Sequence, residues 1–288
     1  MNCPICHSDV DVKYKLTFNV YQCNKCNFQF APDACFDKSL VSDLDESSRI
    51  KALKNLRMLN FNRIVISLKK HIDRNETGLE VGSGHGWFLE TCKENEINCV
   101  GIEPETHFND LYKSIGVEVL NGFFPDVVPS DTRYDFIAYN DVFEHLPDIQ
   151  AVMKTNNNLL NSNGKLIVNI PLLGGVTYII SKLAYLFGVK SLINRMWQFN
   201  FHSPHLSYFS KKNLIELAES ADFKLIESFP LKTINLSEIK DRVNEDKNSN
   251  LVFRYISIIG VFALYPFMQL LPDTYCFIFQ KKDKNNVA

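Results

Sequence analysis

The sequence predicts an α/β fold in which helices cover both faces of a mostly parallel sheet. From residue 78 onward, short runs rich in Val, Ile and Phe alternate with runs whose apolar residues follow helical spacing. Such alternation is typical of βαβ units. The chain has 288 residues, 45% of them hydrophobic and 22% charged, which suits one sizeable globular core with a small appendage.

The expected elements follow one another in order. A long amphipathic helix begins near Arg49, after an acidic, turn-like stretch that ends near Ser48. The seven expected strands are 78–82, 98–104, 117–122, 134–140, 164–171, 223–231 and 274–282. The helices expected between them are 87–96, 107–115, 148–160 and 211–221.

Two units are expected from this organisation. Residues 1–37 carry two CxxC pairs on a short polar segment and predict a small metal-binding knuckle. Residues 49–288 predict the main domain, with a helical lid inserted at 172–201, after the fifth strand. Ligands enter open α/β folds at the C-terminal edge of the sheet, where this insertion is expected to lie.

Two stretches are more apolar than the α/β pattern requires. Residues 172–189 carry the single charge Lys182, and residues 255–272 carry none. Each approaches the roughly 20 residues of a membrane span, but Gly, Ser or Pro interrupts both. We interpret them as buried helices or a lid, with peripheral membrane contact as the alternative. Because the start MNCPICHSDV has no secretory pattern, we expect a cytoplasmic protein, at the inner membrane face if these stretches contact lipid.

The CxxC pairs are Cys3 with Cys6 and Cys23 with Cys26, with sixteen residues between the pairs. In a reducing compartment, closely paired thiolates are metal ligands rather than disulfides. Two such turns complete a tetrahedral four-thiolate site that prefers zinc, and a closed set of four ligands makes the metal structural. Redox use of a CxxC pair is the alternative, although that chemistry needs only one pair.

A glycine-rich loop, with Gly82, Gly84 and Gly86, joins the first strand to the first helix. Glycines let the backbone turn tightly and approach a ligand closely. The GxGxG spacing differs from the GxGxxG of dinucleotide sites. Glu80 stands just before the loop, where a carboxylate would repel a pyrophosphate but could pair with an ammonium group. An ammonium group is present on the methionine part of S-adenosylmethionine (SAM).

A second carboxylate ends the next strand, at Glu103 in the run GIEPE, followed by Pro104. A carboxylate at this place can accept hydrogen bonds from ribose hydroxyls, in nicotinamide and SAM sites alike. Nucleoside binding is therefore predicted.

Four motifs resemble one family. LEVGSGHGWFLE, GIEPE and YDFIAYNDVFEHLPD are similar to the first, second and fourth motif regions of class I SAM-dependent methyltransferases. FHSPHLSYFSKKNLIELAESADFKLIE resembles the segment after the fifth strand in bacterial small-molecule members. The resemblance covers about residues 75–230 in the family's order. It implies a Rossmann-like, doubly wound seven-stranded sheet with the last strand antiparallel, and SAM across the C-terminal ends of the strands.

The resemblance also implies roles for residues of this chain. Gly82, Ser83 and Gly84 would line the methionine end of SAM, and Glu103 would hold the ribose. Asn121 and Phe123 would flank the adenine, with a plain turn and a core aromatic as the alternative, because Asn-Gly favours turns. Asn140 and Asp141 would lie near the sulfonium and the methionine carboxyl.

Methyl transfer to a hydroxyl or a carbon acid needs a base, and histidine is the usual one near neutral pH. The candidates are His145 in FEHLPD, and His202 and His205 in FHSPHLSYFS. We expect His145 to shape the cofactor pocket, since its motif occurs with many different substrates.

The segment around His205 resembles YHEHLSYFS of certain deoxysugar C-methyltransferases, in which a Glu-His pair serves as base. Pro204 stands here in place of that glutamate and His202 in place of the tyrosine, which puts ketosugar C-methylation in doubt. The alternative is that His205 only caps a strand end beside Phe209.

The charge pattern does not favour nucleic acid as substrate. The formal net charge is -2, and acidic residues outnumber basic ones in residues 1–37. We therefore predict a SAM-dependent methyltransferase that acts on a small molecule or glycan, in sugar, polysaccharide or other secondary-metabolite biosynthesis. Two alternatives stay open: an rRNA or tRNA methyltransferase that uses the knuckle for RNA, and a non-catalytic SAM-fold binding module.

Overall fold

The computed structural model of the protein describes residues 1–35, 46–199, 201–236 and 251–283. Its strands are β1 (Val10–Lys15), β2 (Asn19–Cys23), β3 (Gln29–Phe30), β4 (Thr77–Val81), β5 (Asn98–Glu103), β6 (Val119–Asn121), β7 (Tyr134–Asn140), β8 (Leu160–Pro171), β9 (Ser207–Tyr208), β10 (Phe223–Leu231) and β11 (Thr274–Lys281). Its α-helices are α1 (Glu46–Leu68), α2 (Trp87–Glu94), α3 (Asn109–Ile115), α4 (Ile149–Leu159), α5 (Val176–Leu186), α6 (Ser191–Met196), α7 (Lys211–Ser220) and α9 (Leu251–Leu270). Two short 3-10 helices are η1 (Thr106–Phe108) and η2 (Phe143–His145).

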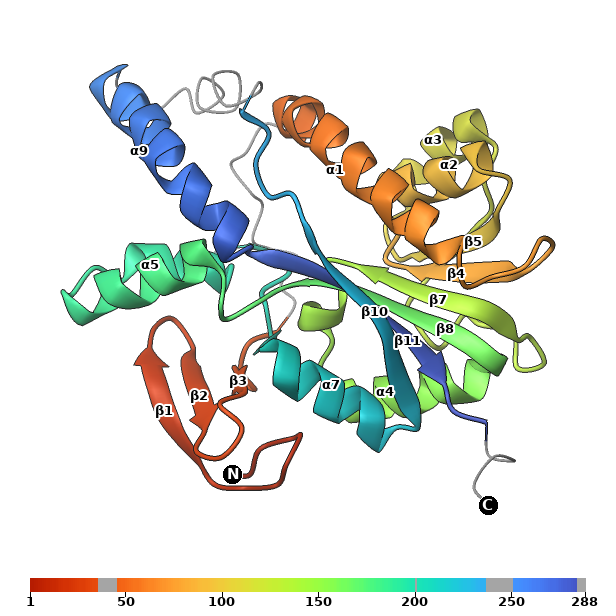
Figure 1. The fold of residues 1–288 in the computed structure, drawn as a ribbon, viewed down its shortest axis with the longest axis horizontal. Helices are drawn as coiled ribbons and strands as arrows, with labels where there is room; N and C mark the ends of the chain where they lie inside the picture. Colours follow the sequence, from red (N-terminus) through yellow and green to blue (C-terminus); the bar gives the residue numbers. More distant parts are fainter. Residues whose placement is uncertain (36–45, 200, 237–250, 284–288) are drawn as a thin grey trace.

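A seven-stranded sheet forms the centre of the molecule (Figure 1). The strand order is β10-β11-β8-β7-β4-β5-β6, and β11 runs antiparallel to both of its neighbours. The other pairs in the sheet are parallel. The predicted α/β class, the seven strands and the antiparallel last strand are confirmed. The chain passes from β4 to its neighbour β5 on one side, whereas β7 lies on the other side of β4, so the strand order reverses there. A ligand crevice is therefore expected at the C-terminal ends of β4 and β7.

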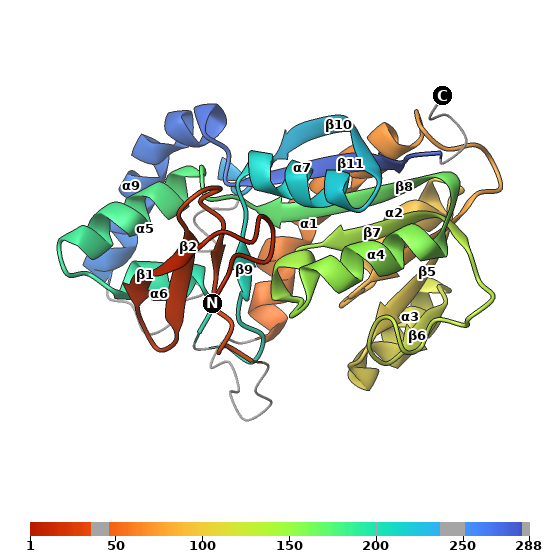
Figure 2. The ribbon, with the colours of Figure 1, turned by 90° about the horizontal axis from the view of Figure 1, so that it is seen from below.

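Helices lie on both faces of the central sheet (Figures 1 and 2). Alternating side chains of the central strands pack against helices on opposite faces. On β7, Phe136 and Ala138 pack in the cluster that contains side chains of α1 and α2. Ile137 and Tyr139 pack in the cluster with α4 and α7. Successive side chains point to opposite faces, and both faces are covered by helices. The central strands are therefore nearly continuous apolar runs in the sequence.

The N-terminal segment joins a second, smaller sheet with the order β1-β2-β3-β9. Gln29 and Phe30 of β3 pair antiparallel with Tyr208 and Ser207 of β9, far along the chain. The rings of Phe28 and Phe209 lie 4.9 Å apart. The predicted boundary between the knuckle and the main domain falls mostly outside the described residues.

Helices α5 and α6 occupy the stretch predicted as a lid, and α9 precedes β11. Both views place α5 and α9 side by side at the end of the molecule away from β5 and β6 (Figures 1 and 2). Hydrogen bonds join them at their base, where Val176 N donates to Leu271 O over 3.1 Å. Among the described helices, none has the length and apolar character needed to cross a membrane.

Candidate active site

The glycine-rich loop between β4 and α2 brings backbone N–H groups to the C-terminal edge of the sheet. Gly82 has φ +74°, and a Cβ there would meet the Val142 side chain at 2.6 Å, so only glycine fits. Gly84 has φ +48° and would place a Cβ in open space, and Gly86 adopts φ +71°. Ser83 is buried within this loop. The loop therefore leaves room for a ligand above Gly84.

The carboxylate of Glu103 is held in place beside this loop. Its Oε2 accepts a hydrogen bond from Gly84 N (2.8 Å), and its Oε1 accepts one from Glu105 N (3.0 Å). Each oxygen keeps a further lone pair for a ligand hydroxyl. Burial raises the pKa of Glu103. Pro104 follows it and is exposed.

The side chain of Asn121 lies next to Glu103 at the end of β6. Its Nδ2 donates to the backbone carbonyl of Glu103 (3.3 Å) and its amide pairs with that of Asn109 at 3.1 Å. The ring of Phe123 is 58% exposed and is therefore not a core aromatic. Both side chains stand at the rim of the loop region.

Glu80 and Asn140 form a buried polar pair below the loop. Asn140 Nδ2 donates to Glu80 Oε1 over 2.9 Å. Among the described residues, the other carboxylate oxygen of Glu80 and the Oδ1 of Asn140 make no hydrogen bond. Burial raises the pKa of Glu80 to about 8. Buried acceptors of this kind need a donor, and an ammonium group would supply one while favouring the ionised carboxylate. These residues fit the methionine end of SAM.

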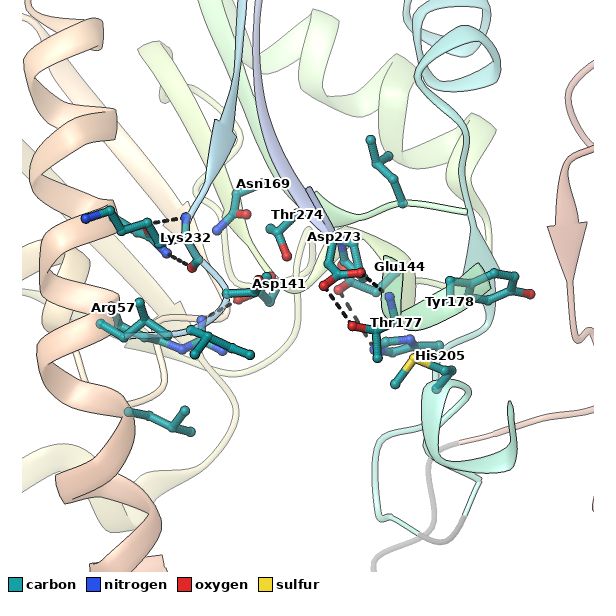
Figure 3. Close-up of a pocket in the computed structure, with 18 of the residues that line it drawn as sticks. Arg57, Asp141, Glu144, Asn169, Thr177, Tyr178, His205, Lys232, Asp273 and Thr274 are labelled. Carbon is teal, nitrogen blue, oxygen red and sulfur yellow. Dashed lines mark hydrogen bonds and ion pairs between the residues drawn. The ribbon is translucent and has the colours of Figure 1, made fainter. Parts of the chain in front are cut away.

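Asp141 stands between this region and a second one. It follows β7 with φ +54°, and its backbone N–H donates to Asn169 O over 2.9 Å. Its carboxylate forms an ion pair with Arg57 of α1. Beyond it, a cavity of about 670 Å3 opens, and Figure 3 shows Asp141 between its two walls.

The walls of this cavity are mostly polar. Arg57 and Lys232 lie on one side, and Thr177, Tyr178, Glu144 and His205 lie on the other (Figure 3). Further polar residues of the lining are Asn60, His145, Asn169, Arg195, Gln198, Tyr208, Thr233, Asp273 and Thr274. A volume of this size is typical of a small-molecule site.

A buried histidine and a buried glutamate meet at the cavity wall. Nε2 of His205 lies 3.9 Å from Glu144 Oε1, and the two side chains are 6% and 2% exposed. The Gln198 amide nitrogen lies 2.9 Å from the same Nε2. Nδ1 of His205 has no hydrogen-bond partner among the described residues.

His145 supports this pair. Its ring lies 4.7 Å from that of His205. Its Nδ1 donates to the backbone carbonyl of Pro204 over 2.8 Å, which ties down the residue before His205. His202 lies on the bend that leads into this segment and is half-buried.

Burial shifts the two titratable groups in opposite directions. It lowers the pKa of His205 well below its ordinary value, with the neighbouring His145 adding to the effect. It raises the pKa of Glu144 well above its ordinary value, and the charge of Asp141 adds to this shift. His205 is therefore neutral, the base form, at neutral pH. Protonation of His205 and ionisation of Glu144 favour each other, since an opposite charge within about 4–6 Å favours the charged form.

Comparison with known protein families identifies the family of the chain. A family model described as a methyltransferase domain matches residues 52–228. This chain belongs to the class I SAM-dependent methyltransferases. The methyltransferase is 26% identical to "C-methyltransferase NovU" of Streptomyces niveus over 219 residues, 73% of this chain and 47% of that protein. The chain thus spans about half the length of this relative.

Solved structures share the fold of this methyltransferase. Mycolic acid cyclopropane synthase CmaA1 superposes with a TM-score of 0.55 at 16% identity, over 76% of this chain and 83% of its own. A SAM-dependent methyltransferase from Thermotoga maritima gives a TM-score of 0.52 at 17% identity, over 83% and 95% of the two chains. At such low sequence identities the structural similarity establishes only that the fold is shared.

The four N-terminal cysteines of the methyltransferase form one cluster. The Sγ atoms of Cys3 and Cys26 lie 3.6 Å apart, and those of Cys6 and Cys23 lie 3.3 Å apart. All four sulfur atoms lie within 4.8 Å of one another. Tetrahedral zinc with Zn–S bonds of about 2.3 Å separates its sulfurs by about 3.8 Å, so the cluster is compatible with zinc.

Several residues of this site were not singled out from the sequence. Glu144 lies inside the quoted FEHLPD motif, where only His145 was chosen. Arg57 and Lys232 line the cavity from α1 and from the end of β10, outside the family motifs. No sequence signal singles out Arg57, because the predicted first helix carries several basic residues.

Glu103 provides a direct test of the cofactor half. Glu103→Ala is expected to weaken SAM binding, measured by calorimetry, by about 1.5–3 kcal/mol, because ribose hydroxyls would lose a charged acceptor. Glu105→Ala is the matched control, since the Glu105 side chain is exposed and pairs with His107. Unchanged affinity in Glu103→Ala would place this residue outside the site, and preference for a nicotinamide dinucleotide over SAM would contradict the cofactor assignment.

Proposed function

We propose that this methyltransferase transfers a methyl group from SAM to a carbon atom of a small hydroxylated acceptor, such as a sugar or a glycan unit. The observation that carries the proposal is the buried pair of His205 and Glu144 in the wall of a polar cavity next to Asp141. A carbon acceptor has to lose a proton, and the pair offers a base for this step.

The cavity supports a small acceptor with many hydroxyl groups. Arg57, Lys232 and Asn169 offer donors on one side, and Asp273 offers acceptor oxygens near the other. Such convergent polar groups suit hydroxyls better than an apolar ring. With a formal net charge of -2, the protein has no overall electrostatic attraction for an RNA backbone. A small hydroxylated acceptor is therefore preferred to the rRNA or tRNA alternative. The match to the methyltransferase family favours an enzyme over a non-catalytic binding module.

SAM, when bound, supplies the electrophilic methyl group. Gly82, Gly84, Glu80 and Glu103 would hold it, with Asn140 and Asp141 at the border with the cavity. His205 takes the proton from the acceptor, and Glu144 stabilises the charged imidazole that results. His145 keeps the segment of His205 in place through the carbonyl of Pro204. Burial of the pair excludes water from the proton transfer.

Glu144 can replace the glutamate whose position in the resembling motif is taken by Pro204. The carboxylate missing beside His205 in the sequence is present in space, because η2 brings Glu144 to it. The name of the relative NovU, C-methyltransferase, agrees with a carbon acceptor. We also propose that Cys3, Cys6, Cys23 and Cys26 hold one zinc ion with a structural role only, since four thiolates leave no open position.

The acceptor atom can be determined with labelled cofactor. The protein is incubated with SAM that carries a 13C methyl group and with a panel of hydroxylated carbonyl compounds, nucleotide-linked sugars and tRNA. We expect a 13C signal in the range of a methyl group on carbon, in a sugar product. A signal typical of an O-methyl or N-methyl group would contradict the carbon acceptor, and methylated tRNA would support the alternative.

A further inference from the structure

Large apolar side chains are concentrated at one end of the molecule. Of the sixteen exposed large apolar side chains in the described part of the chain, eleven belong to residues 183–192 and 259–271. They are Leu183, Leu186, Phe187, Val189, Leu192, Ile259, Phe262, Leu264, Phe267, Leu270 and Leu271, called here the apolar end. Single exposed apolar residues are normal, but a cluster marks an interaction surface.

The most exposed members lie on both helices and on the turn after α5. Phe187 is 86% exposed and Leu186 is 71% exposed, where α5 turns into α6. On α9, Leu270 is 77% exposed and Ile259 is 67% exposed. Figures 1 and 2 both show α5 and α9 projecting together beyond the central sheet. The interpretation of these stretches as buried helices therefore does not hold for these side chains, and the lid and membrane-contact interpretations stay open.

The charged residues within the two stretches that carry the apolar end are all basic. Residues 172–199 contain Lys182, Lys190 and Arg195 and no acidic residue. Residues 251–272 also contain no acidic residue. This is a local bias, because the whole chain has 33 acidic and 31 basic residues. Lys15 of β1 lies beside this surface, where its carbonyl accepts from Lys190 Nζ over 3.4 Å.

An apolar surface bordered by cations is complementary to a bilayer with anionic headgroups. A second copy of this chain would bring the same cations to the interface and no acidic side chain of this surface to meet them. Helix α5 has eleven residues, about half of the roughly 20 that a membrane span needs, so it would lie along the interface.

We propose that the apolar end docks on an anionic lipid bilayer, with Leu186 and Phe187 inserted among the lipids and Lys182 and Lys190 on the headgroups. The same helices form walls of the cavity, through Tyr178 of α5 and Val261 and Met268 of α9. Docking would therefore bring the cavity next to the bilayer. The docking itself does not depend on the proposed methyl transfer.

Sedimentation with vesicles tests the proposal on the purified full chain. We expect binding to vesicles of phosphatidylcholine mixed with phosphatidylglycerol, weaker binding at high salt, and little binding to phosphatidylcholine alone. Leu186→Ser combined with Phe187→Ser is expected to weaken binding at least about tenfold, because two apolar side chains are lost. Both residues are exposed, so circular dichroism should show an unchanged fold. Ile66→Ser, at a 60% exposed site on α1, is the matched control and should bind as the wild type does.

Four results would overturn the proposal. They are the absence of vesicle binding, equal binding to neutral vesicles, and full binding by the double variant. The fourth is a dimer in solution that the double variant dissociates, which would assign the apolar end to contact between copies. SAM affinity, measured in parallel, reports on the proposed function separately.

Discussion

Replacing His205 by alanine is expected to lower the turnover of the methyltransferase by about 100-fold or more, the size usual for the loss of acid–base help. The affinity for SAM should stay unchanged, because His205 lies in the cavity wall and not in the glycine loop. The measurement is kcat with the identified acceptor, together with calorimetry of SAM binding.

The pH dependence of turnover provides a second test of His205 as the base. Burial lowers the pKa of His205, so its base form is present at neutral pH and is lost only on acidification below that depressed pKa. Turnover of the wild type should therefore be level above about pH 6.5, the ordinary histidine pKa, and fall well below it. The acid limb should be absent in His205→Ala.

Two variants serve as companions to this experiment. Glu144→Gln should lower kcat by about tenfold with KM unchanged, since loss of about 1.4 kcal/mol of charge stabilisation corresponds to that factor. His71→Ala is the control, because His71 pairs with Glu227 on another part of the molecule. Full activity in His205→Ala would eliminate its role as base, and loss of SAM binding would assign it to the cofactor pocket.

Removal of the metal from the four-cysteine cluster is expected to unfold the N-terminal segment. Structural zinc contributes about 10–16 kcal/mol to the folding of small units, and all four of its expected ligands lie within residues 1–35. Because β3 pairs with β9, which follows His205 closely, turnover should also fall while SAM affinity is largely kept. Hydrogen exchange should show lost protection in residues 1–35 and 206–209, with the central sheet still protected.

Elemental analysis checks the metal itself. One zinc per chain is expected in the wild type and in Cys35→Ser, because Cys35 is exposed and outside the cluster. Cys23→Ser should lose the metal. Less than about half a zinc per reduced wild-type chain would contradict the closed four-ligand site.

Local features of the sequence predicted most of the fold and indicated the candidate cofactor residues. Strand periodicity and the order of the elements indicated the seven-stranded sheet, since a period of two and a period of 3.6 are visible within a few residues. The loop at Gly82 and Gly84 and the carboxylate of Glu103 stand at strand ends, where the topology brings ligands. The CxxC pairs are likewise local, so their cluster followed from spacing alone.

The acceptor half depends on contacts between residues far apart in the chain. Glu144 meets His205 across 61 positions, and Arg57 pairs with Asp141 across 84. Strand β9 has two residues, too few for a periodic pattern, and its pairing with β3 places the cysteine segment behind His205. The sequence also left open whether the side chains of the apolar end are exposed, because an apolar run is compatible with a buried helix or with a helix on the surface. Only the packing of helices and sheet, which depends on non-local burial, determined where these side chains lie.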